Sequence, residues 1–390
     1  MKILLVVSSA NDIFIFNLAK WLKQSMDCTI DAFELNPSVT ANQEDSSGLF
    51  ETVETADRSC WWWKNTLTRF VYSPLKFAKQ LDEFVSNKHY DVIHIHGVWA
   101  YLPLTNNLRA HTDKLFVSFW GIEHIKGEVW HSHLIYDYRL RRLIKTIDGI
   151  TGTIARLKVM KELFPETPLY ESRLGVASLD TIVNLNNSQT KEESKRYWEM
   201  PVNKISVLIG YSGKRAHNHL DIIKALKKYP KLYSHVHLLA PMTRGASSDY
   251  VKEVEQALIH SGYSFTLQKN RFLTDEEIGV LRHATDVVFQ FADRDAYSRS
   301  IIESICAGAI LIYGNWIKYK DLLADDGFEA FETDSIEGGI KILNDYVISP
   351  EKYMLIGKKN VSAGCKQYQW SECIKDFVGI YTGEKNAEVF

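Results

Sequence analysis

The sequence predicts an α/β chain with two doubly wound parallel sheets, each with its own core. Its 390 residues exceed the roughly 100–200 residues of one domain, so two or three cores are expected. Short apolar runs alternate with helical patterns from the first residue onward, as in strands joined by crossover helices. A polar stretch at 183–204 interrupts the pattern, which restarts at 205. We therefore expect two units facing a cleft, with ligands at the carboxyl ends of the strands.

The expected elements follow from these apolar runs. In the helix at 13–24, the spacing of Phe14, Leu18 and Leu22 places them on one face, which can pack on the first strand. Strands are expected at 2–7, 28–33, 91–95, 115–119 and 149–153, then at 205–209, 235–240, 264–267, 286–291 and 309–313. In the second half, helices are expected at 218–228, 247–260, 274–284 and 299–307. The expected domains are 1–182 and 205–366, with a linker and a short helix at 183–204 and a helix within 367–390 that crosses back to the first domain.

The composition is that of a folded chain without a strongly charged partner. Hydrophobic residues make up 45% and charged residues 24%, which excludes a disordered or fibrous chain. The net charge of −2 gives no global field for nucleic acid. Five scattered cysteines, with no C-x-x-C pair, favour a reducing cytoplasm over a disulfide framework or a zinc site. Because the apolar start is too short for a signal peptide and no apolar run reaches 18 residues, we expect a cytoplasmic protein.

The loop after the strand at 205–209 suits a diphosphate. Gly210 and Gly213 allow close approach of the backbone, and the helix that follows directs free N–H groups outward. Lys214 and Arg215 add positive charge. Neither a Walker A motif nor G-x-G-x-x-G is present, which argues against an ATPase or a dinucleotide enzyme. An ordinary glycine-rich turn with two solvated cations is the alternative. The candidate diphosphate-binding residues of this loop are Gly210, Ser212, Gly213, Lys214, Arg215 and Asn218.

A second polar loop follows the apolar strand at 286–291 and leads into a helix. Asp295 is expected in this loop, and Glu303 about two turns further on. Ser298 and Ser300 can cap the helix, whose first N–H groups would form a second anion site. The alternative is a loop acid and a solvated helix position.

The two loops together resemble the donor-binding domain of retaining GT-B glycosyltransferases, family 4 in particular. The resemblance is carried by Asp295 and Glu303, eight positions apart, by 284–288 and 303–312, and by His94-Ile95-His96-Gly97. It implies a GT-B fold of two Rossmann-like doubly wound domains. A second resemblance is local. Residues 119–123, 210–219 and 240–242 are similar to the bacterial transferases that add 4-acetamido-4,6-dideoxygalactose to lipid-linked enterobacterial common antigen intermediates.

The resemblance implies roles for individual residues. Glu303 matches the glutamate that holds the donor ribose, and Asp295 replaces the glutamate beside the transferred sugar. Trp120 replaces a histidine that often contacts that sugar, and Glu123 is close by. The expected catalytic set is Asp295, Glu303 and Glu123, and the expected acceptor-binding residues are Asn11, His96, Trp120 and His124. The family implies a nucleotide-diphosphate-sugar as co-substrate, with no bound metal and no other cofactor.

A basic, aromatic segment without acids at 58–79 includes Trp61, Trp62 and Trp63. This composition is typical of a membrane interface and equally of an aromatic core with a solvated basic rim. A second basic stretch, with Arg139, Arg141, Arg142 and Lys145, is expected to be solvated. His94 and His96 could form a metal pair, but the absence of a third ligand nearby favours strand-end residues that line the cleft.

These observations predict a cytoplasmic glycosyltransferase, peripheral on the inner face of the membrane, that uses a nucleotide-sugar donor and a glycan or lipid-linked glycan acceptor. Two alternatives stay open. One is a nucleotide-sugar 2-epimerase, which would need no apolar acceptor surface. The other is a non-catalytic GT-B-like scaffold, which is compatible with the departures at Asp295 and Trp120.

Overall fold

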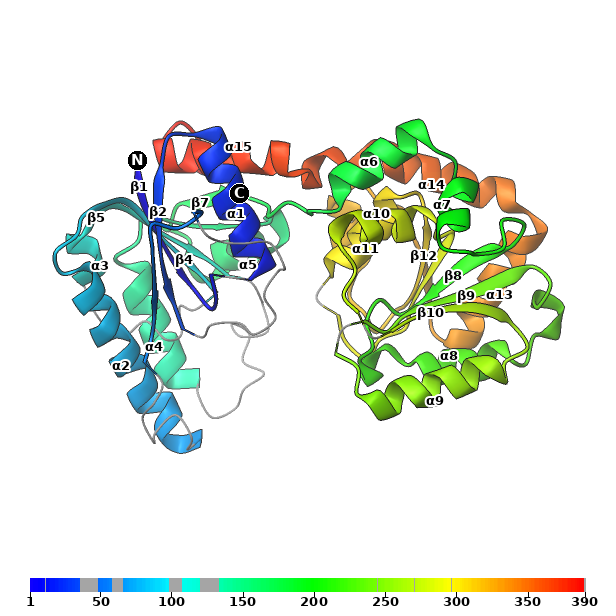
Figure 1. Cartoon of the computed structure of the whole chain (residues 1–390). Helices are drawn as coiled ribbons and strands as arrows, with labels where there is room; N and C mark the ends of the chain where they lie inside the picture. The colour runs from blue at the N-terminus through cyan, green and yellow to red at the C-terminus, as the bar shows by residue number, and fades with distance from the viewer. Residues whose placement is uncertain are drawn as a thin grey trace. The chain divides into compact units, whose positions relative to one another are not determined.

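The computed structural model describes residues 1–10, 12–35, 48–57, 66–97, 107–119, 133–243, 245–269, 271–295 and 297–388. They form two compact units (Figure 1). The first unit combines Met1–Gly175 with Trp370–Phe390, and the second is Val176–Gln369.

The first unit is a parallel sheet with helices on both faces. Its described strands follow the order β3-β2-β1-β4-β5-β6-β7, so the strand order reverses between β1 and β4. The strands are β1 (Lys2–Val7), β2 (Thr29–Glu34), β3 (Thr52–Thr55), β4 (Tyr90–His96), β5 (Thr112–Ser118), β6 (Gly149–Gly152) and β7 (Leu169–Glu171). The helices are α1 (Ile13–Ser25), α2 (Thr66–Val85), α3 (Asn107–Ala110), α4 (His133–Ile144), α5 (Ile154–Leu163) and α15 (Trp370–Thr382).

The last helix packs on the first sheet because its apolar face is buried there. Phe377 and Ile380 of α15 join Leu18 and Leu22 of α1 in one buried cluster under β1. Asp12 caps α1 by accepting a hydrogen bond from the backbone N–H of Phe14 at 2.9 Å. The chain therefore ends in the unit in which it begins.

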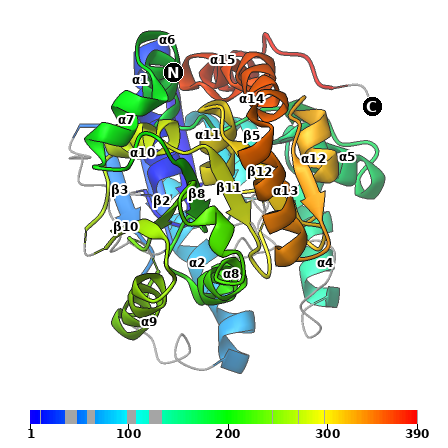
Figure 2. The ribbon, with the colours of Figure 1, turned by 90° about the vertical axis from the view of Figure 1, so that its right-hand side faces the viewer.

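The second unit is also a parallel sheet, with the order β10-β9-β8-β11-β12-β13 among its described strands. The order reverses between β8 and β11. The strands are β8 (Ile205–Ile209), β9 (Val236–Pro241), β10 (Ser264–Gln268), β11 (Val287–Gln290), β12 (Ile310–Gly314) and β13 (Phe331–Thr333). The helices are α6 (Leu179–Ser188), α7 (Lys191–Tyr197), α8 (His219–Leu226), α9 (Ser248–Ile259), α10 (Asp275–His283), α11 (Arg299–Cys306), α12 (Lys320–Asp325), α13 (Ile336–Ile348) and α14 (Pro350–Gly364). Figures 1 and 2 show α8 and α9 on one face of this sheet and α10 and α11 on the other.

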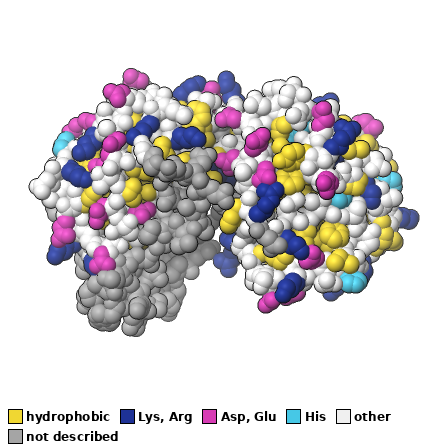
Figure 3. Space-filling model, in the orientation of Figure 1, with side chains coloured by type: hydrophobic (Ala, Val, Ile, Leu, Met, Phe, Trp, Pro, Cys, Tyr) yellow, Lys and Arg dark blue, Asp and Glu magenta, His cyan; other side chains and the backbone are white. Residues whose placement is uncertain are grey.

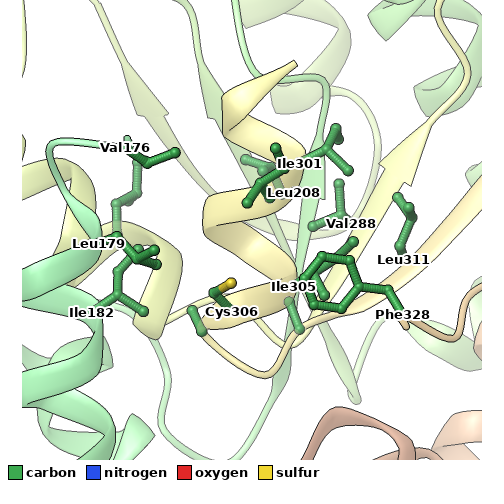
Figure 4. Close-up of a cluster of buried hydrophobic side chains, with 14 of the residues drawn as sticks. Val176, Leu179, Ile182, Leu208, Val288, Ile301, Ile305, Cys306, Leu311 and Phe328 are labelled. Atoms are coloured by element: carbon green, nitrogen blue, oxygen red, sulfur yellow. The ribbon is translucent and has the colours of Figure 1, made fainter. Parts of the chain in front are cut away.

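The segment expected as a linker belongs to the second core. Figure 4 shows Leu179 and Ile182 of α6 beside α11, whose Ile301 and Ile305 pack against the sheet through Leu208 and neighbouring strand residues. Burying these side chains at about 25 cal/mol per Å² of apolar surface favours their packing on the core. Where a linker and a short helix are expected, residues 183–204 hold most of α6 and all of α7.

The remaining expected elements are confirmed to within about three residues at each end. The expected elements do not include three short strands, β3, β7 and β13, or the helices α2, α3, α5, α12, α13 and α14. Both β7 and β13 have only three residues, too short for a hydrophobic period to be recognised.

The described surface carries both signs of charge. On the face visible in Figure 3, Lys and Arg side chains are interspersed with Asp and Glu on each unit. Within the described ranges, no helix is both long enough and apolar enough to cross a membrane.

Candidate functional site

The two polar loops singled out in the sequence meet at the carboxyl edge of the second sheet. They follow β8 and β11, the neighbouring strands between which the strand order reverses. The backbone N–H of Asp293 donates to the carbonyl of Ala216 at 2.9 Å. Asn218 Nδ2 donates to the Phe291 carbonyl at 2.8 Å and to Asp293 Oδ1 at 2.9 Å. Because open parallel sheets bind ligands at such a reversal, these loops form the candidate site.

The glycines of the first loop permit close packing within the protein. Gly210 has φ +73°, and a Cβ there would lie 2.8 Å from His219 Nε2. A Cβ on Gly213 would lie 2.3 Å from the Cβ of Ala246. Both glycines therefore fold the loop closely against its neighbours, and the approach of a ligand to their backbone stays a prediction.

The two cations of this loop differ in their partners. Arg215 is bound to Glu253 of α9 by two hydrogen bonds, at 2.6 and 3.1 Å, and its guanidinium lies 4.4 Å from the ring centroid of Tyr250. Lys214 is exposed, and no carboxylate in the described part of the chain pairs with it. Lys214 is therefore the cation of the loop that is available to an anion.

Buried polar atoms without a hydrogen-bond partner among the described residues gather around these loops. They include Ser212 Oγ, His217 Nδ1, His219 Nε2 and Gln290 Oε1. Burial lowers the pKa of His217, and it lowers the pKa of His219 to about 3, so both rings are neutral at pH 7. Folded proteins rarely leave buried polar atoms unsatisfied, so this edge offers hydrogen-bonding capacity to a ligand or to water.

Asp295 is held by side chains from three other segments. Tyr211 donates to Oδ1 at 2.9 Å, and Gln290 Nε2 donates to Oδ2 at 2.8 Å. Tyr319, which is fully buried, also donates to Oδ2. The carboxylate therefore connects the ends of β8, β11 and β12, and its hydrogen bonds fix its orientation.

Glu303 lies on the buried side of α11 in an ion pair. Its Oε2 accepts from Arg282 Nε at 3.0 Å, and its Oε1 accepts from Ser178 Oγ at 2.9 Å. Arg282 is 4% exposed, and its Nη1 has no hydrogen-bond partner in the ranges that the structure describes. This pairing gives Glu303 a structural role whatever it contributes to a ligand.

Ser298 is the N-cap residue of α11, although its side chain makes no capping hydrogen bond to the helix. Ser300 is half-buried in the first turn, where its carbonyl accepts from Ser304 Oγ at 2.7 Å. The N-cap residue of α11 thus lies three residues after Asp295, and the helix N-terminus adds partial positive charge to the candidate site.

Of the residues predicted in the first half, only His96 is described. It ends β4 and is 1% exposed, its ring centroid 3.9 Å from that of His94, and burial lowers its pKa to about 3. His94 is bound to Tyr381 of α15 and to Ser118, at 2.6 and 2.9 Å. These contacts make His94 a core residue. Asn11, Trp120, Glu123 and His124 lie outside the described residues.

Sequence reasoning missed four groups of this site, Ser178, Arg282, Gln290 and Tyr319. They lie on four different segments, and each contacts Asp295 or Glu303 only through the fold. No local spacing distinguishes them. Arg282, for example, lies in the last turn of α10, where an arginine is ordinarily solvated, so its burial could not be expected.

No family model matches the chain, and no curated protein matches it. Solved structures are similar over nearly its whole length. Sucrose-phosphate synthase from Thermosynechococcus elongatus has a TM-score of 0.71 at 12% identity, covering 98% of this chain and 99% of that one. WaaG, a glycosyltransferase involved in lipopolysaccharide biosynthesis, has a TM-score of 0.67 at 13% identity, covering 98% and 100%. HepE from Anabaena, in complex with UDP, has a TM-score of 0.65 at 14% identity, also covering 98% and 100%.

The chain has the GT-B fold. The expected fold class is thereby confirmed, with two parallel α/β units of seven and six described strands. At these identities the similarity concerns the fold alone, so the assignments of individual site residues remain predictions.

Proposed function

We propose that the protein is a glycosyltransferase that moves a sugar from a nucleoside-diphosphate sugar to a glycan acceptor. The observation that carries the proposal is the junction of the loops after β8 and β11. There a cation and several buried polar atoms without a partner among the described residues occur beside a helix N-terminus. A diphosphate needs this combination of positive charge and N–H donors. The neighbour HepE was solved with UDP, which supports a nucleotide ligand for this fold.

The proposed chemistry assigns a task to each part of the site. Lys214 and the first N–H groups of α11 would stabilise the negative charge that develops on the leaving diphosphate, without a metal ion. The hydrogen-bonded carboxylate of Asp295 would lie beside the transferred sugar, whose transition state carries positive charge. Glu303 would hold the donor ribose with the lone pairs that Arg282 and Ser178 leave free.

The test compares two adjacent cations. Removing one oriented donor to a transition state costs about 2.7–4 kcal/mol, so Lys214→Ala should slow donor hydrolysis or transfer at least tenfold. Arg215→Ala is the matched control and should have a smaller effect, since Arg215 already pairs with Glu253. Equal rates for Lys214→Ala and the wild type, over a panel of nucleotide-sugars, would contradict the donor-site assignment.

For the acceptor, we propose a lipid-linked glycan of the bacterial surface, met at the inner face of the cytoplasmic membrane. The proposal rests on the composition of 58–79, of which 58–65 lie outside the described residues. At its described end, Phe77 is buried and Lys79 is exposed, so this segment serves the core and the surface together. Wild-type binding to anionic vesicles, lost when Trp61, Trp62 and Trp63 are all changed to Ser, would support attachment. Absence of vesicle binding by the wild type would exclude membrane attachment.

The likeness to 4-acetamido-4,6-dideoxygalactose transferases stays a prediction.

A non-catalytic binding subunit is the second candidate. It is favoured by the engagement of both oxygens of Asp295 and of Glu303 with protein donors. Saturable nucleotide binding with no hydrolysis or transfer of any donor would select it over the enzyme.

A further inference from the structure

A cavity of about 840 Å³ lies at the amino edge of the second sheet, opposite the candidate donor site. Ile205 and Ile310, the first residues of β8 and β12, line it, as does Asp286, which directly precedes β11. Its walls include parts of α7 and α14, both labelled at this side of the second unit in Figure 1. Its volume is typical of sites for small organic molecules.

Two lysines of α7 share one buried carboxylate in this cavity. Lys195 Nζ lies 2.5 Å from Asp286 Oδ2, and Lys191 Nζ lies 3.8 Å from Asp286 Oδ1. Burial lowers the pKa of Lys191. The two lysines hold the pKa of Asp286 below its usual value although burial opposes its charge. One carboxylate therefore faces two ammonium groups, and an incoming anion would balance the second.

The charge of the whole lining is also positive. Four lysines and two acids line the cavity. Lys204 donates to the Tyr233 carbonyl at 2.9 Å and so points its ammonium elsewhere, whereas Lys358 on α14 is exposed. Lys191 also donates to a carbonyl, that of Thr285 at 2.6 Å, but Thr285 directly precedes Asp286 in the lining, so this contact keeps the Lys191 ammonium at the cavity with further N–H groups to donate. Lys191 and Lys358 are therefore the cations best placed for an anionic group.

The other part of the lining is apolar and partly open to water. Met354 is 52% exposed and Val202 is 38% exposed, and Val347 and Val361 lie in the same wall. Covering such side chains with an apolar ligand gains about 25 cal/mol per Å² buried. The lining thus combines a cationic part with an apolar part.

The floor of the cavity is built from closely packed backbone. Gly308 adopts φ +78°, and a Cβ on Gly357 of α14 would lie 2.6 Å from the Gly308 carbonyl oxygen. Lys191 Cε lies 3.9 Å from the position that a Cβ on Gly308 would take. The helix and the turn are thus in direct contact, and this contact fixes one end of the cavity beside Lys191.

We propose that this cavity binds a small amphiphilic anion. Its phosphate or carboxylate would meet Lys191 and Lys358, and its apolar chain would lie on Met354 and Val202. A charged hydrogen bond to lysine is stronger than a neutral one, and the apolar contact adds affinity that inorganic phosphate cannot gain. The site is separate from the proposed donor site, since none of the candidate donor residues lines it.

The test is calorimetric titration of the full-length protein with octyl phosphate and with octanoate, each below its micellar concentration. The wild type should bind at least one of them at a single saturable site, at least tenfold more tightly than it binds inorganic phosphate or octanol. Lys358→Gln and Met354→Glu should each weaken binding at least tenfold. The matched controls are their exposed neighbours on α14, Lys359→Gln and Leu355→Glu, which do not line the cavity and should stay within about twofold of the wild type.

Three outcomes would overturn the proposal. In the first, the folded wild type binds neither amphiphile. In the second, it binds octanol or inorganic phosphate as tightly as it binds the amphiphiles. In the third, the control variants weaken binding as much as Lys358→Gln and Met354→Glu do. All four side chains substituted on α14 are exposed, so each variant should keep the thermal stability needed for the comparison. Because no nucleotide is used, the result is independent of the proposed transfer activity.

Discussion

Replacing Glu303 by Ala should destabilise the second unit strongly. The change removes the carboxylate that binds Arg282 at 3.0 Å and Ser178 at 2.9 Å. Arg282 is 4% exposed, so its guanidinium would stay buried without that partner. Breaking a buried ion pair in this way costs about 3–5 kcal/mol, because the remaining charge is not solvated.

The assay is urea unfolding followed by tryptophan fluorescence, with Trp198 in the same core cluster as a reporter. Replacing both partners, as in the Glu303→Leu, Arg282→Met double variant, should recover most of the lost stability, since packed apolar side chains substitute for a buried pair. Lys228→Ala is the control. Its pair with Glu337 is exposed and screened by water, so its loss should change the stability little.

A loss below about 1 kcal/mol in Glu303→Ala would refute the buried-pair account. The stability measurement also determines how an activity loss is to be interpreted. If Glu303→Gln folds with nearly wild-type stability and still loses transfer, the residue acts on the donor. If stability and transfer fall together, the ion pair with Arg282 explains both.

Three further predictions concern packing, hydrogen bonding and pH. Tyr319→Phe should cost about 1.5–3 kcal/mol, the usual worth of a hydrogen bond to a charged group, and should lower the urea midpoint; an unchanged midpoint would contradict the role given to Asp295. Gly357→Ala should cost at least about 1 kcal/mol in the same assay, because its Cβ would lie 2.6 Å from the Gly308 carbonyl oxygen, and wild-type stability would show that α14 can shift. Burial lowers the pKa of His237 to about 4, so its contribution to stability is present above the unfolded value of 6.5 and is lost as the pH falls toward 4. Between pH 7 and pH 5 the free energy of unfolding should therefore fall by about 2 kcal/mol through this residue, and His237→Gln should remove that part of the fall; an identical pH dependence would disprove it.

Much of the fold could be predicted from the sequence because buried parallel strands are short continuous apolar runs. The runs at 205–209 and 286–291, each followed by a polar loop, also located the candidate site. Strand order places these loops side by side, and this order cannot be read from either run alone.

The partners of the site residues could not be predicted, since they depend on tertiary contacts. Arg215 and Lys214 are adjacent in the sequence, yet only Arg215 meets a glutamate, because α9 carries Glu253 to that side of the loop. Glu303 was predicted from its position eight residues after Asp295 in the sequence, whereas its buried partner Arg282 comes from another helix. Local pattern thus identified the candidate residues and left their charge environment undetermined.

The central claim is that the second unit binds the nucleotide part of a sugar donor at the loops after β8 and β11. Its most direct test is calorimetric titration of the full-length protein with UDP, TDP, GDP, CDP and ADP, repeated with Lys214→Ala. The wild type should bind at least one of these diphosphates at a single saturable site, and Lys214→Ala should weaken this binding at least tenfold. If the folded wild type binds none of the five, or if Lys214→Ala binds as tightly as the wild type, the account is contradicted.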